Sequence, residues 1–461
     1  MALDLGSKDA RPRAVVVAVQ LPDQTDGELA SSIAELERLA KTLGLDPIAR
    51  VTQRRARLAP GVVLGEGKLV ELAKWTGGTG IVPAYEKPGR KQSDEEDLEE
   101  LEELKAEPEA TDAVDKPGEA KVVLVDHELS PTQQRNLEKA TGVDVLDRTS
   151  VILEIFHRHA HTREARLQVE IARLKYEAPR LREGGGGGDR VRGGVGGKGA
   201  GESSLELDRR RIRDRIAELR HELAQIEGGS ATRRRRRSDV PTVALVGYTN
   251  AGKSSLMRAL TSSEVYIADK LFATLDTTVR RLQPPTEPPI LVSDTVGFIK
   301  KLPHDLVASF RSTLDEAGDA DLLLHVIDAA DPAHADQLAV TRAVLGELGA
   351  DTATTWLVLN KIDKVSPEER ARLSENYPGA LQLSAKDPAD VARLRERLVE
   401  QFGGAMEEAE LDVPYAAHRV VHAIHERTTV LAEEHHDEGT RLRVRAPARV
   451  LESIRDSLRA N

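Results

Sequence analysis

The sequence predicts a mixed α/β protein with several domains. Short apolar runs of strand length alternate with longer stretches whose apolar residues recur every three or four positions, a pattern typical of helices packed on parallel sheets. Several apolar runs end in glycine, aspartate, asparagine or lysine, which carry function at the carboxyl ends of parallel strands. The chain has 461 residues, enough for about two to four domains.

The composition excludes several classes of protein. Cysteine is absent, so disulfides and thiolate metal sites are excluded. Residues 1–13 lack the apolar core of a signal peptide, and no run approaches the roughly 20 apolar residues of a membrane span. We therefore expect a cytoplasmic protein with no membrane partner.

Most of the net charge lies in one segment. Ten acidic residues and one lysine fall within residues 94–109 and account for most of the net charge of −11. We expect this acidic insertion, at about residues 90–117, to be solvated and disordered. The remaining chain is nearly neutral and carries basic patches, so nucleic-acid partners are not excluded.

Residues 10–160 are predicted to form an N-terminal α/β domain. Residues 13–19 are apolar enough for a buried strand, and residues 28–43 have the spacing of a helix. A second apolar run at residues 122–125 ends at a polar pair, as a parallel strand would.

Residues 161–230 are predicted to form a helical hairpin. The first helix is expected at residues 162–182 and the second at residues 205–226. Each has an apolar stripe at helical spacing, and two such stripes can pack as an antiparallel pair. The stripes are Leu167, Ile171, Leu174 and Ala178, and then Ile212, Ile216, Leu219, Leu223 and Ile226.

Two segments of the hairpin region leave alternatives open. Residues 184–201 are mostly glycine with interspersed charges, which fits either a flexible linker or a mobile tip that orders against a phosphate-bearing partner. Residues 231–240 form a basic linker with five consecutive arginines, Arg233 to Arg237. The arginines are either solvated or in contact with phosphates, and we favour phosphate contact.

A phosphate-binding motif follows the linker. Residues 243–246 are apolar and precede the pattern G-x-x-x-x-G-K-S and a helical stretch, the context that a P-loop requires. Its glycines let backbone N–H groups turn toward phosphate oxygens, Lys253 supplies a cation to the β- and γ-phosphates, and the Ser254 hydroxyl suits Mg²⁺. The expected site residues here are Gly247, Tyr248, Thr249, Asn250, Ala251, Gly252, Lys253, Ser254 and Ser255.

Two further segments are predicted to complete the phosphate site. An apolar run at residues 290–293 precedes the D-x-x-G pattern, Asp294, Thr295, Val296 and Gly297. Asp294 would hold Mg²⁺, and the N–H of Gly297 would face the γ-phosphate. Between the two motifs, a threonine is expected to complete the Mg²⁺ shell, with Thr274 preferred over Thr277 and Thr278. Its neighbours Phe272, Ala273, Leu275 and Asp276 are expected to contact the nucleotide.

A base-recognition motif follows two more apolar runs, which are predicted strands at residues 322–327 and 356–359. Residues 356–359 precede the N-K-x-D pattern, Asn360, Lys361, Ile362 and Asp363. Guanine presents N1–H and N2–H₂ donors that the Asp363 carboxylate can accept, whereas adenine presents neither. A buried carboxylate left unpaired gives discrimination of roughly 10⁴-fold. After residues 380–383, the residues Ser384, Ala385 and Lys386 would support the guanine O6.

These motifs predict a GTP-hydrolysing P-loop enzyme. Each follows a predicted strand, so all should meet at one edge of a parallel sheet in a Ras-like G-domain, residues 241–403. Mg²⁺ is the expected cofactor, held by Ser254, Thr274 and Asp294.

Two positions bear on the rate of hydrolysis. Phe298 stands where many regulatory GTPases carry the glutamine that orients the attacking water. We therefore predict slow hydrolysis by the isolated protein, and basal turnover broadly intact in Phe298→Ala. Asn250 is a candidate K⁺ ligand, with K⁺ standing in for an arginine finger; other roles for this side chain are open.

Residues 411–461 are predicted to form a small α/β domain. We expect a helix, strands at residues 429–433 and 440–445, and a last helix. His418, His422 and His425 share one helix face, but no carboxylate completes a metal site with them. We expect packing or surface roles there, and also for His157, His159 and His161.

With these motifs the chain resembles the HflX family, the ribosome-associated members of the Obg–HflX branch of translational GTPases. The resemblance covers nearly the whole chain, and Phe298 is itself a mark of that branch. Upstream, residues 126–131, 147–149 and 167–170 are similar to the N-terminal signatures of the family, and residues 201–210 to its second hairpin helix.

The resemblance implies a GTPase that binds the large ribosomal subunit and its rRNA, with the glycine-rich tip near the peptidyl-transferase centre. It implies coupling of the GTP state to ribosome association or splitting under stress, with hydrolysis stimulated by the ribosome. We expect a monomer that is partly ribosome-associated. Two alternatives stay open: a GTP-dependent regulator of a non-ribosomal protein partner, and an RNA-binding ribosome assembly factor.

Overall fold

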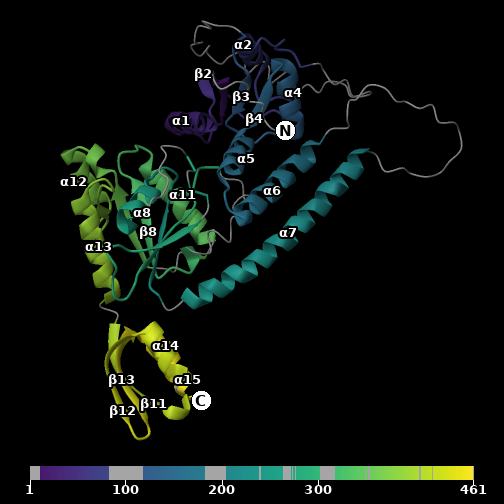
Figure 1. The fold of residues 1–461 in the computed structure, drawn as a ribbon. Coiled ribbons are helices and arrows are strands. Elements are labelled where there is room, and N and C mark those ends of the chain that lie inside the picture. Colours follow the sequence, from purple (N-terminus) through teal and green to yellow (C-terminus); the bar gives the residue numbers. More distant parts are fainter. Residues whose placement is uncertain are drawn as a thin grey trace, which may run out of the picture. The chain divides into compact units, whose positions relative to one another are not determined.

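The structure is a computed structural model that describes residues 11–82, 118–181, 204–237, 240–262, 271–272, 274–275, 277–301, 317–347, 349–350, 354–403, 406–417 and 419–459. The expected acidic insertion and glycine-rich tip lie outside these residues, as do Ala273, Asp276 and His418. The chain divides into two compact units, residues 1–159 with 169–217, and residues 160–168 with 218–461. Figure 1 labels their helices and strands along the chain. No helix among the described residues is long and apolar enough to cross a bilayer.

The N-terminal part alternates strands and helices. Its elements are β1 (Arg13–Gln20), α1 (Asp26–Leu43), β2 (Asp46–Arg54), α2 (Glu66–Thr76), β3 (Val122–Val125), α4 (Pro131–Thr141), β4 (Asp144–Asp147), α5 (Arg148–His159), α6 (Arg163–Glu177), the short 3-10 helix η1 (Ala178–Arg180) and α7 (Ser204–Arg237).

The N-terminal strands form a four-stranded parallel sheet in the order β2-β1-β3-β4. The strands predicted at residues 13–19 and 122–125 and the helix predicted at residues 28–43 are confirmed as β1, β3 and α1. Strand β2 was not predicted, because only Val51 of its nine residues is buried and its sequence has no apolar run. It is an edge strand, and edge strands need only one apolar face.

Local signals fix the helix ends in this sheet. Helix α1 begins at a capping box in which Thr25 and Glu28 satisfy each other's backbone N–H groups, and α4 begins at the same arrangement of Ser130 and Gln133. Helices α1 and α4 end at glycines in the left-handed conformation, with φ 87° at Gly44 and 72° at Gly142. The capping boxes lie at the carboxyl edge of the sheet, where the strands end, and the glycines lie at its amino edge, where the next strands begin.

Helices α6 and α7 are joined by ion pairs in antiparallel register. The Arg163 guanidinium pairs with Glu222, and that of Arg215 pairs with Glu170 at 3.3 Å. The five residues predicted as the apolar stripe of the second helix are all buried or half-buried, while most of their neighbours are exposed. The burial pattern of α7 therefore follows the predicted stripe.

The ends of the two hairpin helices differ from the prediction. Helix α6 ends at Glu177, because Pro179 disfavours the α conformation of the preceding residue, and a 3-10 turn follows. Helix α7 continues to Arg237, so residues 231–237 of the predicted basic linker have a helical backbone. Arginine is a good helix former and is favoured near a helix C-terminus, which explains the extension.

The second unit holds the G-domain. Its elements are β5 (Thr242–Gly247), α8 (Lys253–Thr261), β6 (Thr278–Arg281), β7 (Leu291–Asp294), β8 (Leu322–Asp328), α11 (His334–Glu347), β9 (Thr354–Asn360), the 3-10 helix η3 (Ile362–Lys364), α12 (Pro367–Asn376), β10 (Leu381–Gln382) and α13 (Pro388–Gly403).

Six strands of the G-domain form one sheet in the order β10-β9-β8-β5-β7-β6. All neighbours are parallel except β6, which pairs antiparallel with β7 at the edge. The five predicted strands of this domain are confirmed, and β6 was missed because it is short and half-exposed. Apolar clusters cover both faces of the sheet. Because five of the strands are parallel, the loops that follow them lie at the same edge of the sheet.

The C-terminal domain is a three-stranded antiparallel sheet in the order β11-β13-β12 with two helices. Its elements are β11 (Met406–Pro414), the 3-10 helix η4 (Tyr415–Ala417), α14 (Arg419–Arg427), β12 (Thr429–His436), β13 (Gly439–Pro447) and α15 (Ala448–Arg459). Strand β11 was not predicted, although Ala409, Leu411 and Val413 are buried between exposed acidic residues. That alternation is the usual signal of a half-buried strand.

Candidate nucleotide-binding site

A cavity of about 300 Å³ lies at the carboxyl edge of the six-stranded sheet. It is lined by Thr249, Asn250, Gly252, Lys253, Ser254, Ser255, Phe272, Thr274, Thr295, Gly297, Asn360, Lys361, Asp363, Lys364, Ser384, Ala385 and Lys386. All of these except Lys364 are residues that the sequence predicted for the site. The other described site residues are buried beside lining residues in the chain: Gly247, Tyr248, Ala251, Leu275, Asp294, Val296 and Ile362.

The P-loop depends on glycine at two positions. Gly247 and Gly252 have φ angles of 146° and 97°, which other residues rarely adopt. A Cβ atom at Gly247 would lie 2.1 Å from the carbonyl oxygen of Val326, and one at Gly252 would lie 2.2 Å from Nδ2 of Asn360. Glycine therefore allows the loop to lie directly against the neighbouring strand ends.

Lys253 begins α8 and its ammonium group lies inside the P-loop. Nζ donates hydrogen bonds of 3.0 Å to the carbonyl oxygens of Gly247 and Tyr248. Burial lowers the pKa of Lys253 to about 8, while the charge of Asp294 opposes this. A phosphate anion in the cavity would favour the charged ammonium.

Two hydroxyls and one carboxylate form the candidate Mg²⁺ site. The oxygens of Ser254 and Thr274 are 2.7 Å apart, and these hydroxyls lie 2.7 Å and 3.0 Å from Oδ2 of Asp294. Asp294 is fully buried, and its Oδ1 has no hydrogen-bond partner among the described residues. Burial raises the pKa of Asp294, and the charge of Lys253 opposes this.

This set of donors fits Mg²⁺, which binds few protein oxygens and completes its shell with water and phosphate. Ser254, Thr274 and Asp294 would hold the ion, which when bound neutralises charge on the phosphate oxygens. The contacts of Thr274 favour it over Thr277 and Thr278 as the threonine of this site.

The backbone after Asp294 is attached to the P-loop. Phe298 N–H donates to the carbonyl of Gly247 at 3.2 Å, and the Phe298 carbonyl accepts from Thr249 N–H at 2.7 Å, so that Tyr248 and Phe298 form a parallel bridge. The Tyr248 hydroxyl accepts the N–H of Lys300 at 2.7 Å. These bonds attach the backbone at Phe298 and Lys300, which follows the D-x-x-G motif, to the P-loop. We call the residues that follow Asp294 the second switch segment.

Gly297 lies close to the P-loop residues Thr249 and Lys253, where there is no room for a side chain. A Cβ atom there would lie 2.7 Å from Cα of Thr249 and 3.1 Å from Nζ of Lys253. Glycine alone leaves room for a phosphate group next to the Lys253 ammonium.

The Phe298 side chain points away from the cavity. It is 2% exposed and packs in an apolar cluster with Val246, Leu323 and Leu345. It offers no hydrogen-bonding group to a water at the phosphates. Truncation to alanine would also remove buried packing, which costs about 3–5 kcal/mol, so the turnover of Phe298→Ala must be measured on folded protein.

Asn360 connects the P-loop to the base-recognition loop. Its Nδ2 donates to the carbonyl of Ala251 at 2.8 Å, and its Oδ1 accepts the N–H of Ala385 at 3.0 Å. The residue is 1% exposed, so both bonds are shielded from water.

Lys361 makes a second connection. Its Nζ donates to the carbonyl of Asn250 at 2.7 Å and forms an ion pair with Asp328 at 2.8 Å. Asp328 was not predicted as a site residue, although the apolar run of β8 ends at this aspartate. The pattern of polar residues at strand ends was therefore a usable signal for it.

Asp363 is exposed at the mouth of the cavity. A hydrogen bond from Ser384 lowers the pKa of the Asp363 carboxyl, and the charges of Lys386 and Lys364 add to this effect. We expected a buried carboxylate, and the protein does not bury it; a bound base would have to do so. The N–H of Ser384 is held by Asp390 at 2.7 Å, a contact the sequence did not predict because Asp390 lies on the following helix.

The histidines of the C-terminal domain form no described metal site. His425 lies 3.1 Å from Glu433, which is the single carboxylate in its contacts. Among the described residues, no group of three or more histidine, cysteine or acidic side chains could hold a metal ion.

A P-loop, a hydroxyl and carboxylate set suited to Mg²⁺ and an N-K-x-D loop around one cavity define a P-loop GTPase. The central domain matches the family model described as "50S ribosome-binding GTPase" over residues 242–361. The N-terminal part matches the model "GTP-binding GTPase N-terminal" over residues 30–82 and 98–157, and residues 159–237 match "GTP-binding GTPase Middle Region".

Two relatives identify the family. The GTPase HflX of Gluconacetobacter diazotrophicus is 54% identical over 455 residues, which are 98% of this chain and 99% of that protein. The GTPase HflX of Escherichia coli is 38% identical over 444 residues, 95% of this chain and 94% of that protein. The chain belongs to the HflX family and hydrolyses GTP, so both the predicted family and the predicted enzyme class are confirmed.

Among solved structures, a GTP-binding protein from the archaeon Sulfolobus solfataricus in complex with GDP covers 84% of this chain and 99% of its own. Its identity is 22% and the TM-score is 0.42, which is too low to add to the assignment.

Proposed function

We propose that this GTPase binds the large ribosomal subunit and couples its nucleotide state to ribosome association or splitting, under stress. The observation that carries the proposal is the match of the nucleotide-binding domain to a family described as 50S ribosome-binding GTPases. The resemblance of the hairpin region to the HflX family supports rRNA as the part of the large subunit that this protein binds.

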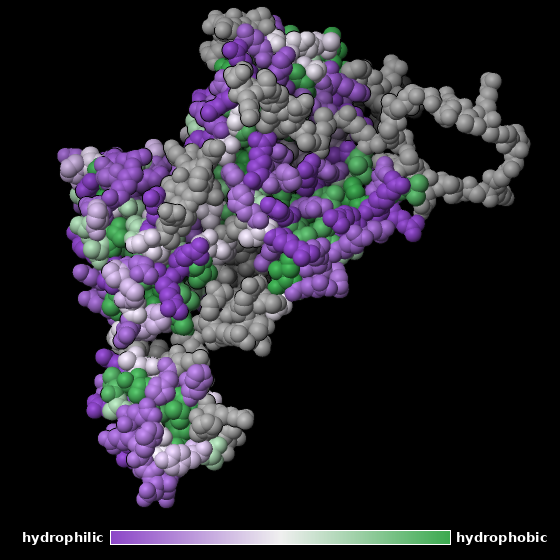
Figure 2. Space-filling view, in the orientation of Figure 1, coloured by the Kyte–Doolittle hydropathy of each residue, from purple (hydrophilic) through white to green (hydrophobic). Residues whose placement is uncertain are grey.

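The surface of α7 supports a nucleic-acid partner. Arg209, Arg211, Arg213 and Arg220 are exposed along the helix. Figure 2 shows hydrophilic residues, with hydrophobic ones between them, over the part of α7 that is not drawn in grey. Exposed arginines bind phosphates and release counterions, which favours association with RNA. Phosphate contact by Arg233 to Arg237, at the end of the same helix, remains part of the proposal.

The switch contacts support coupling between nucleotide and partner. GTP would order the segment around Thr274 through Mg²⁺ and the segment at Gly297 through the γ-phosphate, and hydrolysis would release both. Hydrolysis by the isolated protein would be slow, because Phe298 is buried and supplies no group to the attacking water. A group from the ribosome would complete the site.

Several finer assignments belong to the same proposal. The predicted residues would bind GTP and GDP in the roles given above, and Asn250 would coordinate K⁺. The protein would be a cytoplasmic, partly ribosome-associated monomer. The domain limits predicted from the sequence, at residues 160, 230, 240, 403 and 411, stay part of the proposal. Residues 230 and 411 lie within α7 and β11, so limited proteolysis is expected near residues 240 and 403.

Sedimentation with purified ribosomal subunits tests the proposal. We expect pelleting with the large subunit in a GTP analogue and much less in GDP, and none in Lys253→Ala, which cannot hold the phosphates. RNA binding regardless of nucleotide would instead favour an assembly factor. No association with ribosomes or RNA would favour a regulator of another protein partner and overturn the proposal.

The K⁺ assignment needs a separate experiment. GTP turnover in KCl should exceed turnover in NaCl of equal ionic strength, and Asn250→Ala should abolish the difference. Equal turnover of the wild type in both salts would remove K⁺ from the mechanism.

A further inference from the structure

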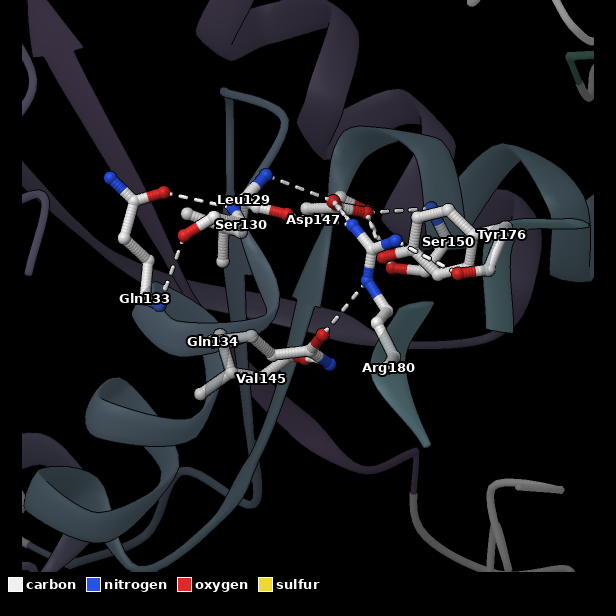
Figure 3. Close-up of polar contacts among 9 residues, drawn as sticks. All are labelled: Leu129, Ser130, Gln133, Gln134, Val145, Asp147, Ser150, Tyr176 and Arg180. Carbon is white, nitrogen blue, oxygen red and sulfur yellow. Dashed lines mark hydrogen bonds and ion pairs between the residues drawn. The ribbon is translucent and has the colours of Figure 1, made fainter. Parts of the chain in front are cut away.

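Asp147 lies at the carboxyl end of β4 and joins four elements of the N-terminal unit (Figure 3). Its Oδ1 accepts the N–H of Ser150 at 2.8 Å, which caps α5, and the hydroxyl of Tyr176 at 2.8 Å, from the last turn of α6. Its Oδ2 accepts the N–H of Leu129, just before α4, at 3.1 Å. The residue is fully buried, so each of these bonds is shielded from water.

Arg180 closes the same network from the end of η1. One guanidinium nitrogen donates to the carbonyl of Leu129 at 2.6 Å and pairs with Asp147 at 3.4 Å, and the other donates to the carbonyl of Tyr176 at 2.9 Å. Nε donates to Gln134 on α4 at 3.3 Å, and the guanidinium stacks on the Tyr176 ring at 3.5 Å from its centre. Figure 3 shows the guanidinium between these side chains.

The hydrogen-bonding partners in this network are groups of the protein itself. Asp147 accepts from backbone, hydroxyl and guanidinium donors, and Arg180 uses nitrogens on every edge of its planar group. A network of this kind leaves no group for a ligand, and its fixed donor geometry specifies one arrangement of the elements it joins. Burial raises the pKa of Tyr176, and the Asp147 charge adds to this, so the phenol remains a donor at neutral pH.

We propose that Asp147, Tyr176 and Arg180 form a joint that fixes the last turn of α6 on the N-terminal sheet and thereby positions the part of the hairpin arm in the same unit, residues 169–177 of α6 and 204–217 of α7. Within the same unit, the ion pair of Arg215 with Glu170 carries the fixed orientation from α6 to α7. The three joint residues are positioning residues and lie outside the nucleotide cavity. The consequence for ribosome binding rests on the proposed function, but the joint itself does not.

Hydrogen exchange of the full-length protein tests the joint directly. In Arg180→Ala, backbone amides of residues 169–177 should exchange about tenfold faster, because the last turn of α6 loses its anchor. Tyr176→Phe removes one bond and keeps the ring, so a smaller acceleration is expected. The matched control is Arg173→Ala on the same helix, where the arginine only pairs with Glu177 one turn away. Unchanged exchange in Arg180→Ala, or equal acceleration in the control, would overturn the joint.

Large-subunit binding tests the positioning role. Arg180→Ala should bind the subunit about tenfold more weakly in a GTP analogue, because a loosely held arm must be ordered on binding. Basal GTP turnover should equal that of the wild type. Arg180→Lys keeps the charge but not the planar set of donors, so it should not rescue binding; full rescue would show that charge alone matters.

The two failures are distinguishable. If the wild type does not bind the subunit while exchange in Arg180→Ala is accelerated, the proposed function fails and the joint stands. If exchange is accelerated but Arg180→Ala binds the subunit as tightly as the wild type, the positioning role is wrong.

Discussion

In both sheets that contain parallel strands, charged residues lie at the carboxyl ends of these strands, but the two edges have different roles. In the N-terminal sheet the Arg148 guanidinium pairs with Glu35 and Asp126 among buried side chains, and the buried Asp147 pairs with the half-buried Arg180. The charged groups of that edge are therefore paired with one another inside the domain. In the G-domain the strand ends surround a cavity of about 300 Å³, and Asp294 keeps one oxygen without a partner among the described residues.

Glycine accounts for much of the difference. The G-domain edge places Gly247, Gly252 and Gly297 where a Cβ atom would lie under 3 Å from a neighbouring atom. Backbone can therefore turn its N–H groups toward an empty volume. At the N-terminal edge, three of the helices begin at side-chain caps: Thr25 for α1, Ser130 for α4 and Asp147 for α5. Charged residues at strand ends thus predict a site only where the loops leave room for a ligand.

The largest expected effect is on nucleotide affinity, which should depend on the carboxyl edge of the G-domain sheet and not on that of the N-terminal sheet. Asp363→Asn should weaken GTP binding by up to about 10⁴-fold, because the amide cannot accept both guanine donors. Fluorescent nucleotide titration measures this. The thermal midpoint should not change, since Asp363 is exposed. Glu375→Gln, an exposed carboxylate of the same domain, is the control, and a comparable loss of affinity there would contradict the assignment.

The second effect concerns stability. Asp147→Asn should lower the free energy of unfolding of the N-terminal domain by about 4 kcal/mol, because Arg180 loses a buried charged partner. Trp75 lies in this domain and Trp356 in the G-domain, so urea unfolding in a Trp356→Phe background isolates the N-terminal signal. Asp144→Asn at the other end of β4 should have little effect. GTP affinity should be unchanged in both, and a drop in affinity for Asp147→Asn would contradict the comparison.

The third effect is a pH dependence in the G-domain. Burial, with the charges of Arg342 and Lys253, lowers the pKa of His325 from 6.5 to about 4. As pH falls from 6.5 to 4, the unfolded chain binds a proton here and the folded chain does not, so about 3 kcal/mol of stability is lost across this window.

His325→Leu removes that titration. Urea unfolding followed by Trp356 in a Trp75→Phe background should show a flatter decline between pH 6.5 and 4 than the wild type. The difference between the two proteins isolates the histidine from the carboxyls that titrate in the same range. Parallel curves would show that His325 is not responsible.

The smallest effect concerns the attachment of the switch to the P-loop. Tyr248→Phe removes the acceptor of the Lys300 N–H, a loss of about 1 kcal/mol, and should lower basal GTP turnover about fivefold. GTP affinity should change little, because the hydroxyl does not line the cavity. The control is Tyr377→Phe, a tyrosine of the same domain that is not a lining residue, and an equal slowing there would remove the role of the Tyr248 hydroxyl.

Local patterns were the strongest predictors. The glycines, Lys253 and Ser254 of the P-loop lie within eight residues of one another, so their spacing alone placed them together. The hairpin stripes were predictable for the same reason, because helical periodicity relates residues three or four apart. Strand β2 and the edge strand β6 were missed, since half-exposed strands carry little apolar signal.

The sequence by itself determined the nucleotide loops, the choice of guanine and the apolar faces of the hairpin helices, because each depends on neighbours in the chain. The sequence preferred Thr274 as the threonine beside Ser254 and Asp294, with Thr277 and Thr278 left open, and the contacts in the tertiary structure favour Thr274. Only the tertiary structure decided that Phe298 packs inward and that Arg180 pairs with Asp147. The polar contacts among these join residues 20 to 40 positions apart, and their geometry depends on how whole helices pack on the sheets.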